Sequence, residues 1–163
     1  RVIYYEFTFY DADNIFISSR KGTAYVPANG RFGIFEPAVS TGKRIPKNTT
    51  FKFASTPEWL KVTEDESKQI IFAEAGVPSN LEIAPRLSVV VENPTLSQVR
   101  NIDVFAIIYD ADDNALAVSK TVVDGLIANS KKNLTFTWRE PFAGDPKRVE
   151  IISQINVFAN RQE

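Results

Sequence analysis

The chain has 163 residues, a formal net charge of -1 and 44% apolar residues, and it contains no cysteine, histidine or methionine. Without cysteine and histidine it can build neither a disulfide framework nor a Cys/His zinc site, and a Ser-His-Asp triad is excluded. The balanced charge argues against non-specific nucleic-acid binding, which needs a basic surplus. The composition is that of an ordinary globular protein of one or two domains.

Targeting and membrane signals are absent from the sequence as given. The N-terminus lacks the charged and apolar regions of a signal peptide, and no apolar run approaches the roughly 18 residues of a transmembrane helix. Because methionine is missing, we expect that Arg1 is not the first residue of the protein.

The N-terminal third of the chain predicts short β-strands joined by polar turns. Apolar and polar residues alternate over residues 3–10, which predicts a strand with Tyr5, Phe7 and Phe9 on one face. The Asp/Asn cluster after this strand has the composition of a hairpin turn. Residues 57–60 predict a short turn or a 3₁₀ segment. Further strands are expected at residues 15–19, 32–35 and 49–54.

The rest of the chain shows the same strand signature. Residues 102–109 are apolar on both faces, which predicts a central strand that is covered on two sides. No long window has helical periodicity, and the best candidate, residues 65–75, holds too many β-branched and aromatic residues. The acidic residues 64–66 predict a solvated linker. Other strands are expected at residues 69–73, 83–92, 115–121, 133–138 and 150–158.

Sequence segments recur in the same order at an offset of about one hundred residues, which indicates an internal repeat. The segments that begin at Tyr10, Pro27, Phe35 and Lys43 correspond to those that begin at Tyr109, Ile127, Trp138 and Lys147. We therefore expect two copies of one module, an incomplete one over residues 1–62 and a complete one over residues 63–163. Too few residues precede the first Tyr-Asp motif for the two strands that precede the second. Short strands separated by turn signals predict a β-sandwich.

Two short motifs resemble one known family. Residues 7–11, FTFYD, fit the FxLYD pattern with Phe9 in place of leucine, and residues 106–110, AIIYD, fit it with Ala106 at the first position. Residues 124–126 resemble a turn that FxLYD modules carry. The resemblance implies immunoglobulin-like β-sandwiches of prokaryotic envelope or secreted proteins, without catalytic residues. We therefore expect an all-β fold of two tandem immunoglobulin-like β-sandwich modules, the first without its N-terminal strands.

The acidic cluster after the second motif is the best candidate for ion binding. Its members Asp110, Asp112, Asp113 and Asn114 resemble the start of an EF-hand calcium loop. The positions that need glycine and a bidentate glutamate hold other residues, however. We therefore expect a hairpin turn in which the first aspartate accepts hydrogen bonds from nearby backbone amides, with a weak calcium site as the alternative.

The remaining polar and aromatic residues favour structural roles. The 20 acidic residues show no pairing that points to glycoside hydrolysis. Trp59 and Trp138 could stack on sugars, but we expect Trp138 on the core face and Trp59 packed under a loop. N-glycosylation sequons begin at Asn48 and Asn133. A solvated surface is expected for the basic residues Lys43, Arg44, Lys47, Lys131 and Lys132.

These features predict a non-enzymatic protein without catalytic, cofactor or metal sites. We expect a structural or adhesive module of a prokaryotic extracellular or cell-envelope protein that spaces or assembles surface structures. The alternative is a carbohydrate- or protein-binding accessory module of a larger secreted enzyme. The open sheet of the first module needs cover, which either upstream strands of the same polypeptide or a neighbouring molecule could supply. Expected partners are other protein chains, copies of this chain included, through an open strand edge. Nucleic acid is not an expected partner. Contact with a membrane is expected only through an anchor outside this sequence.

Overall fold

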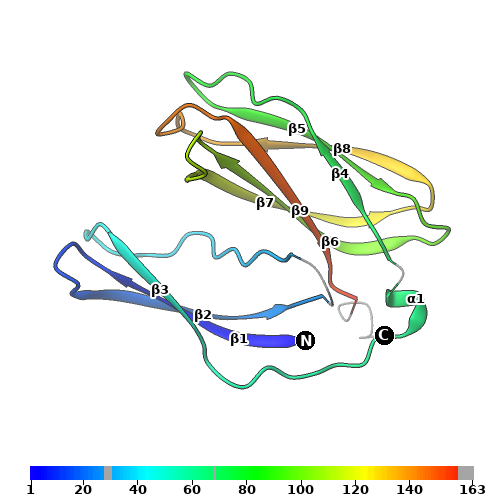
Figure 1. The fold of residues 1–163 in the computed structure, drawn as a ribbon, viewed down its shortest axis with the longest axis horizontal. Helices are drawn as coiled ribbons and strands as arrows, with labels where there is room; N and C mark the ends of the chain where they lie inside the picture. The colour runs from blue at the N-terminus through cyan, green and yellow to red at the C-terminus, as the bar shows by residue number, and fades with distance from the viewer. Residues whose placement is uncertain (28–30, 68, 158–163) are drawn as a thin grey trace. The chain divides into compact units, whose positions relative to one another are not determined.

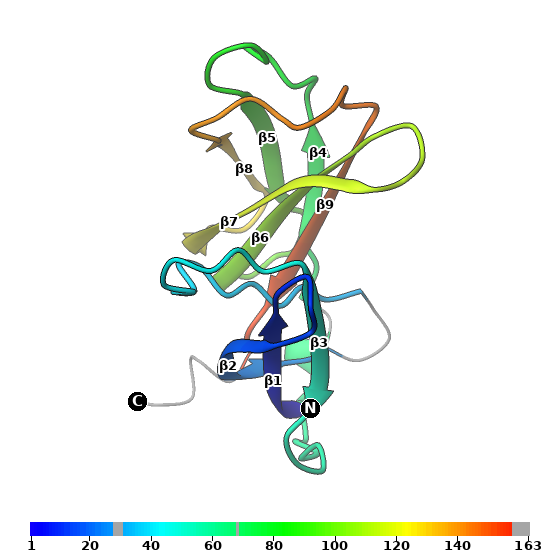
Figure 2. The same cartoon turned by 90° about the vertical axis from the view of Figure 1, so that its left-hand side faces the viewer.

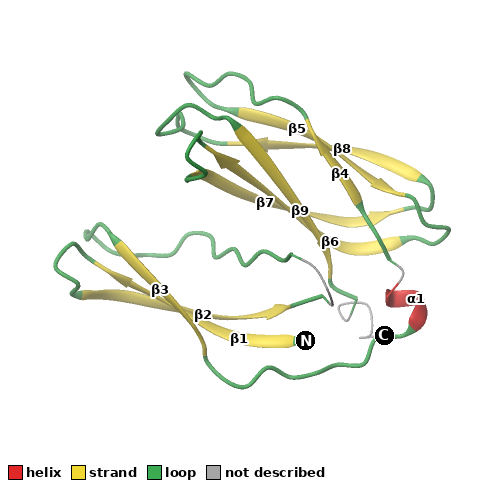
Figure 3. Cartoon of the chain, in the orientation of Figure 1, coloured by secondary structure: helices red, strands yellow, loops and turns green. Residues whose placement is uncertain are grey.

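The computed structural model describes residues 1–27, 31–67 and 69–157. Over these residues the fold is all-β, as expected, with nine antiparallel strands in three three-stranded sheets (Figure 1). The described part holds a single helical turn, α1 (Glu64–Ser67), drawn in red in Figure 3, and no helix long and apolar enough to cross a membrane. The chain divides into a first unit, residues 1–30 and 34–61, and a second unit, residues 31–33 and 62–163.

The first unit is one three-stranded sheet in the order β2-β1-β3 (Figure 2). Its strands are β1 (Val2–Tyr10), β2 (Phe16–Tyr25) and β3 (Asn48–Phe53). The register places Tyr5 opposite Phe53 and Phe7 opposite Phe51. Because opposite residues share a face, the aromatic side chains of both strands lie on the same side of the sheet. The expected aromatic face of the first strand is thus confirmed.

Two expected elements of the N-terminal part are wrong. Residues 32–35 are not a strand, because Gly33 interrupts the run and Pro37 follows it closely. Residues 57–60 form neither a turn nor a 3₁₀ segment. Instead Glu58 pairs with Val2 through two backbone hydrogen bonds of 2.9 Å each, which ties the end of the unit to its first strand.

The second unit holds two three-stranded sheets, in the orders β4-β5-β8 and β7-β6-β9. The strands are β4 (Phe72–Ala75), β5 (Arg86–Asn93), β6 (Val99–Tyr109), β7 (Ala115–Leu126), β8 (Ser130–Thr137) and β9 (Arg148–Ile155). The two sheets share one aliphatic core, and the burial of its side chains is the main stabilising contribution. Strand β6 is central in its sheet, as expected. Fully buried core residues include Leu87, Val89, Val91, Ile102, Val104 and Ile108.

The other predicted strands of the second unit are confirmed with shifts at their ends, but of the strand predicted at residues 69–73 only residues 72 and 73 belong to β4. Strand β5 begins at Arg86 because a turn precedes it, in which the Asn80 amide donates to the Ala84 carbonyl at 2.9 Å. Residue 158 of the last predicted strand lies outside the described residues. Residues 64–66, expected as a solvated linker, belong to α1 near the boundary of the two units, and Glu64 is exposed.

A capping box explains this helical turn. The Thr63 hydroxyl accepts a hydrogen bond from the Glu66 N–H at 3.2 Å, and the Glu66 carboxylate accepts one from the Thr63 N–H at 2.7 Å. These bonds satisfy backbone donors that a helix start leaves unpaired. A Thr-x-x-Glu pattern therefore sets the conformation of the acidic run.

The hairpins β1–β2 and β6–β7 repeat the same local geometry. In each, the aspartate of the Tyr-Asp motif, Asp11 or Asp110, accepts hydrogen bonds from the amides two and four residues later, at 2.8 to 3.0 Å. In each, the strand register also shifts just before the tyrosine. The internal repeat is therefore visible in the backbone as well as in the sequence.

The correspondence extends to the third strand of each sheet. The Lys47 N–H donates to the Tyr10 carbonyl at 2.8 Å, and the Lys147 N–H donates to the Tyr109 carbonyl at 2.8 Å. Strand β3 therefore corresponds to β9, and the sheet β2-β1-β3 to the sheet β7-β6-β9. The expected match of Lys43 with Lys147 is wrong, because Lys47 takes that place.

Candidate binding face

The aromatic side chains of the first sheet form a row that we call the aromatic face: Tyr5 and Phe7 of β1, and Phe51 and Phe53 of β3. Neighbouring rings along the row lie 5.2 to 5.6 Å apart between centroids. Such separations belong to favourable aromatic pairs. The rings therefore pack against one another along one face of the sheet.

The aromatic face is half open to solvent. Phe51 exposes 44% of its surface and Phe53 exposes 56%. All six residues of β3 are exposed, and the described residues of the first unit contain no second sheet. Phe51 and Phe53 therefore leave two neighbouring aromatic rings in contact with water, whereas Tyr5 of the same face is buried.

The corresponding face of the second unit is closed. By the repeat, Tyr5 corresponds to Val104 and Phe7 to Ala106, and both aliphatic residues are fully buried in the core shared with β4-β5-β8. The first copy thus carries larger, aromatic side chains at positions where the second copy carries aliphatic ones. Each copy has its own sheet with the same strand order. In the second copy this sheet packs against the sheet β4-β5-β8.

Glu36 covers the β2 side of the aromatic face. Its carboxylate accepts hydrogen bonds from the Tyr5 hydroxyl at 2.5 Å and from the Arg20 Nε at 2.7 Å. Gly22, opposite Tyr5, leaves the room for this contact, because an added Cβ there would collide with the Tyr5 hydroxyl. Burial, and then the bond to Glu36, raise the pKa of Tyr5, and the bond to Glu36 also raises the pKa of Arg20. Tyr5 therefore stays neutral beside a charged pair.

The acidic cluster predicted from the sequence is a hairpin turn. The Asp110 carboxylate accepts hydrogen bonds from the amides of Asn114 and Asp112, and these bonds, that of Asn114 first, lower the pKa of Asp110. The Asp113 carboxylate pairs with Arg148 at 2.8 Å. Across the described ranges, no group of three or more acidic, histidine or cysteine side chains is placed to hold a metal ion.

The two tryptophans differ in their surroundings. Trp138 is half-buried, packs against the core of the second unit and meets Phe142 at 5.2 Å between ring centroids, close to its expected position. Trp59 is 76% exposed, with the Arg1 guanidinium 3.9 Å from its ring centroid. The expected packing of Trp59 under a loop is therefore wrong.

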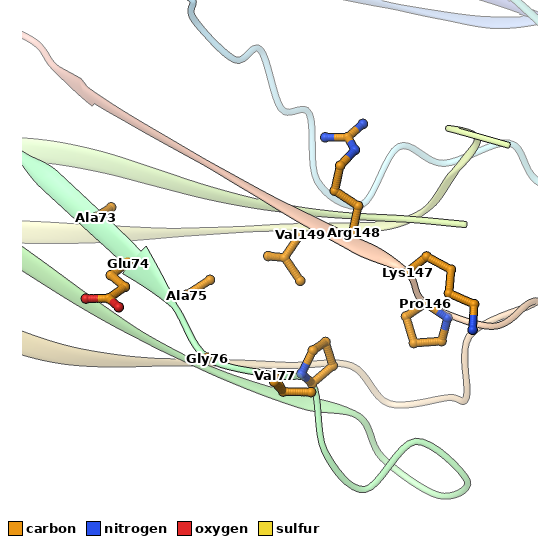
Figure 4. A pocket seen from close by; sticks show the side chains of 10 residues that line it. Ala73, Glu74, Ala75, Gly76, Val77, Pro146, Lys147, Arg148 and Val149 are labelled. Atoms are coloured by element: carbon orange, nitrogen blue, oxygen red, sulfur yellow. The ribbon is translucent and has the colours of Figure 1, made fainter. Parts of the chain in front are cut away.

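A groove opens between the ends of β4 and β9 in the second unit (Figure 4). Its volume is about 490 Å³, and Ala75 and Val149 are among the residues that line it. Lys147 pairs with Asp145 at 2.5 Å, and Arg148, whose side chain points away from Val149 in Figure 4, is bound by the hairpin turn. Because both cations are ion-paired and Glu74 also lines the groove, its lining does not favour an anion.

Sequence reasoning located half of the aromatic face. It placed Tyr5 and Phe7 on one face of a strand but did not predict the face of Phe51 and Phe53. Their spacing of two residues puts these two side chains on the same side of a strand. Only the register shows that this side is that of Tyr5. The basic residues expected on the surface are exposed, and Asn48 of the first sequon donates from its side-chain amide to Asn14 Oδ1 at 2.7 Å.

No family model, no curated protein and no solved structure matches this chain. The resemblance to FxLYD modules therefore rests on its short motifs. The aromatic face and the repeat are the structural features that bear on its function.

Proposed function

We propose that this chain is a non-enzymatic structural or adhesive part of a prokaryotic extracellular or cell-envelope protein, which spaces or assembles surface structures by binding other protein chains. We also propose a more specific fold for the two units. The sheets β4-β5-β8 and β7-β6-β9 form an immunoglobulin-like β-sandwich of the FxLYD type, and the first unit is half of such a sandwich. The observation that carries the proposal is the contrast between one sheet that is closed and its repeat that is half open.

The chemistry of the open face favours a protein partner. Aromatic residues are enriched in the buried centres of protein interfaces, and removing apolar surface from water contributes about 25 cal/mol per Å². Phe51 and Phe53 offer such surface on the edge strand β3. The charged groups beside it, Arg20 and Glu36, bind each other. The face is therefore suited to cover by a second β-sheet, as its repeat is covered.

A carbohydrate-binding accessory module of a larger secreted enzyme is the second candidate. Trp59 favours it, because a ring that is 76% exposed can stack on a sugar. Arg1 already occupies one side of this ring, however, and only the other side is left for a ligand.

A peptide with the sequence of β5 tests the proposal on the intact chain. This strand carries Leu87, Val89 and Val91, which are buried in the core that closes the second copy of the sheet. We expect saturable binding of the labelled peptide, measured by fluorescence anisotropy. The variant Phe53→Ser should weaken it about tenfold, since a loss of ~1.4 kcal/mol corresponds to that factor. Thr50→Ser, on the opposite face of β3, should leave it unchanged.

The same experiment can contradict the proposal. Peptide binding that is absent, or that Phe53→Ser leaves intact, speaks against the aromatic face as a protein site. Binding on a glycan array that Trp59→Ala removes would favour the accessory module instead.

A further inference from the structure

Strand β3 has a free outer edge. In the order β2-β1-β3 it pairs with β1 on one side, and no described residue pairs with its other side. All six of its residues are exposed, and Figure 2 shows it at the side of the sheet. Unpaired backbone groups along a strand edge are a template for another strand.

The register shows which backbone groups face this edge. The Ala54 N–H donates to the Tyr4 carbonyl at 2.7 Å, which marks the even-numbered residues of this segment as those bonded to β1. In an antiparallel ladder, residues that bond to the neighbouring strand alternate with residues that do not. The backbone N–H and C=O groups of Thr49, Phe51 and Phe53 therefore point outward.

The composition of β3 lacks the features that protect strand edges. It contains no proline or glycine, and most of its residues are β-branched or aromatic. Its single charge, Lys52, is neutralised by Glu6 at 3.0 Å. The other edge strand, β2, carries two adjacent charges followed by a glycine: Arg20, which pairs with Glu36, then Lys21 and Gly22. Of the two edges of this sheet, β3 is the one open to pairing.

A second copy of β3 fits this edge around a two-fold axis at Phe51. In this antiparallel register Phe51 faces Phe51 of the second copy, Thr49 faces Phe53, and Thr50 faces Lys52. The outward groups of the odd-numbered residues then bond to one another, and no like charges lie opposite each other. The aromatic faces of both copies lie on the same side.

We infer that this chain pairs with a second copy of itself through the outer edges of β3, which joins two three-stranded sheets into one continuous sheet with a shared aromatic face. The inference rests on the proposed function, because it names a copy of this chain as a protein partner. The pairing closes on itself, since it uses the free β3 edge of each copy and leaves the charged β2 edges outside.

The absence of cysteine from the sequence allows a direct test. Single variants Thr49→Cys, Phe51→Cys and Phe53→Cys of the full chain are oxidised gently, and disulfide-linked dimers are followed with time. Only Phe51 faces its own equivalent, whereas the other two positions are separated from theirs by about 14 Å along the strand. We expect Phe51→Cys to form linked dimers at least about tenfold faster, because a disulfide needs Cα atoms within ~7 Å.

A proline variant tests the pairing without a new thiol. Thr49→Pro removes an outward N–H and should abolish the dimer in sedimentation equilibrium while circular dichroism stays that of the parent. Thr50→Pro removes an N–H bonded to β1 and should instead disrupt the sheet. A dimer that survives Thr49→Pro, equal crosslinking at all three positions, or a chain that stays monomeric would overturn the inference. If that monomeric chain still binds the β5 peptide through Phe53, the inference fails while the proposed function stands.

Discussion

Asn93, at the end of β5, is a buried polar residue that ties two loops of the second unit together. Its side-chain amide donates to the carbonyls of Ser97 at 2.8 Å, Leu126 at 3.0 Å and Ile127 at 3.0 Å. Its Oδ1 accepts a hydrogen bond from the Thr95 N–H at 3.0 Å. Burial of an amide is tolerated because these bonds replace its bonds to water.

Replacement of Asn93 should be costly. Asn93→Ala leaves buried carbonyls without a donor, so we expect the free energy of unfolding of the second unit to fall by about 2–4 kcal/mol. Urea unfolding followed by circular dichroism measures the change. Asn133→Ala, at an exposed position of β8, is the matched control and should change it by less than about 0.5 kcal/mol. Equal losses in the two variants would show that the Asn93 bonds contribute little.

The Asp110 turn makes the stability of the second unit depend on pH. Its amide bonds, that of Asn114 first, lower the pKa of Asp110 below the ordinary value of about 3.9. The carboxylate therefore stabilises the fold above that value, and this contribution is lost as the pH falls through the lowered pKa. Asp110→Asn keeps an acceptor oxygen but does not titrate. We expect it to lose less stability than the parent between about pH 5 and pH 2, in thermal melts at each pH.

Asp112→Asn is the control for this experiment. Asp112 joins the turn through its backbone N–H, so Asp112→Asn removes a neighbouring carboxylate and keeps this hydrogen bond. The explanation fails if Asp110→Asn and the parent lose stability in parallel, or if Asp112→Asn has the larger effect.

At the scale of strands, local patterns located the elements but not their neighbours. The alternation of side chains placed residues 3–10 and 102–109 in strands, and the aspartates after them marked both turns. The same pattern failed at residues 32–35, where a short apolar run has no neighbouring strand. The face of Phe51 was not predicted, because it depends on pairing with a strand more than forty residues earlier.

Two phenylalanines on different strands test the contrast between a closed and an open sheet. Phe136 of β8 is 2% exposed in the core of the second unit, whereas Phe53 is 56% exposed. Phe136→Ala should lower the free energy of unfolding by about 3–5 kcal/mol, because it leaves a cavity. Phe53→Ala should lower it by less than about 1 kcal/mol. Guanidinium unfolding measures both, and a larger loss for Phe53→Ala would mean that its face is closed.

For the whole molecule, the sequence revealed a repeat, but it did not show which residues and which covered surfaces the two copies have in common. The Tyr-Asp motifs aligned correctly because the turn they form needs those residues, and the aspartates make the same bonds in both copies. The match of Lys43 with Lys147 misled because a basic pair is common on a surface and has no structural requirement. The aromatic face was half predicted, since its exposure depends on a second sheet, which the described residues include in the second unit and not in the first.

Hydrogen exchange of the β3 amides, in a chain diluted until it is monomeric, tests the central claim that the outer edge of β3 is open. The account predicts slow exchange at Thr50 and Lys52, whose amides bond to β1, and fast exchange at Thr49, Phe51 and Phe53, whose amides face outward. Equal protection of outward and inward amides in the monomer would mean that another part of the chain covers this edge, and it would contradict the account.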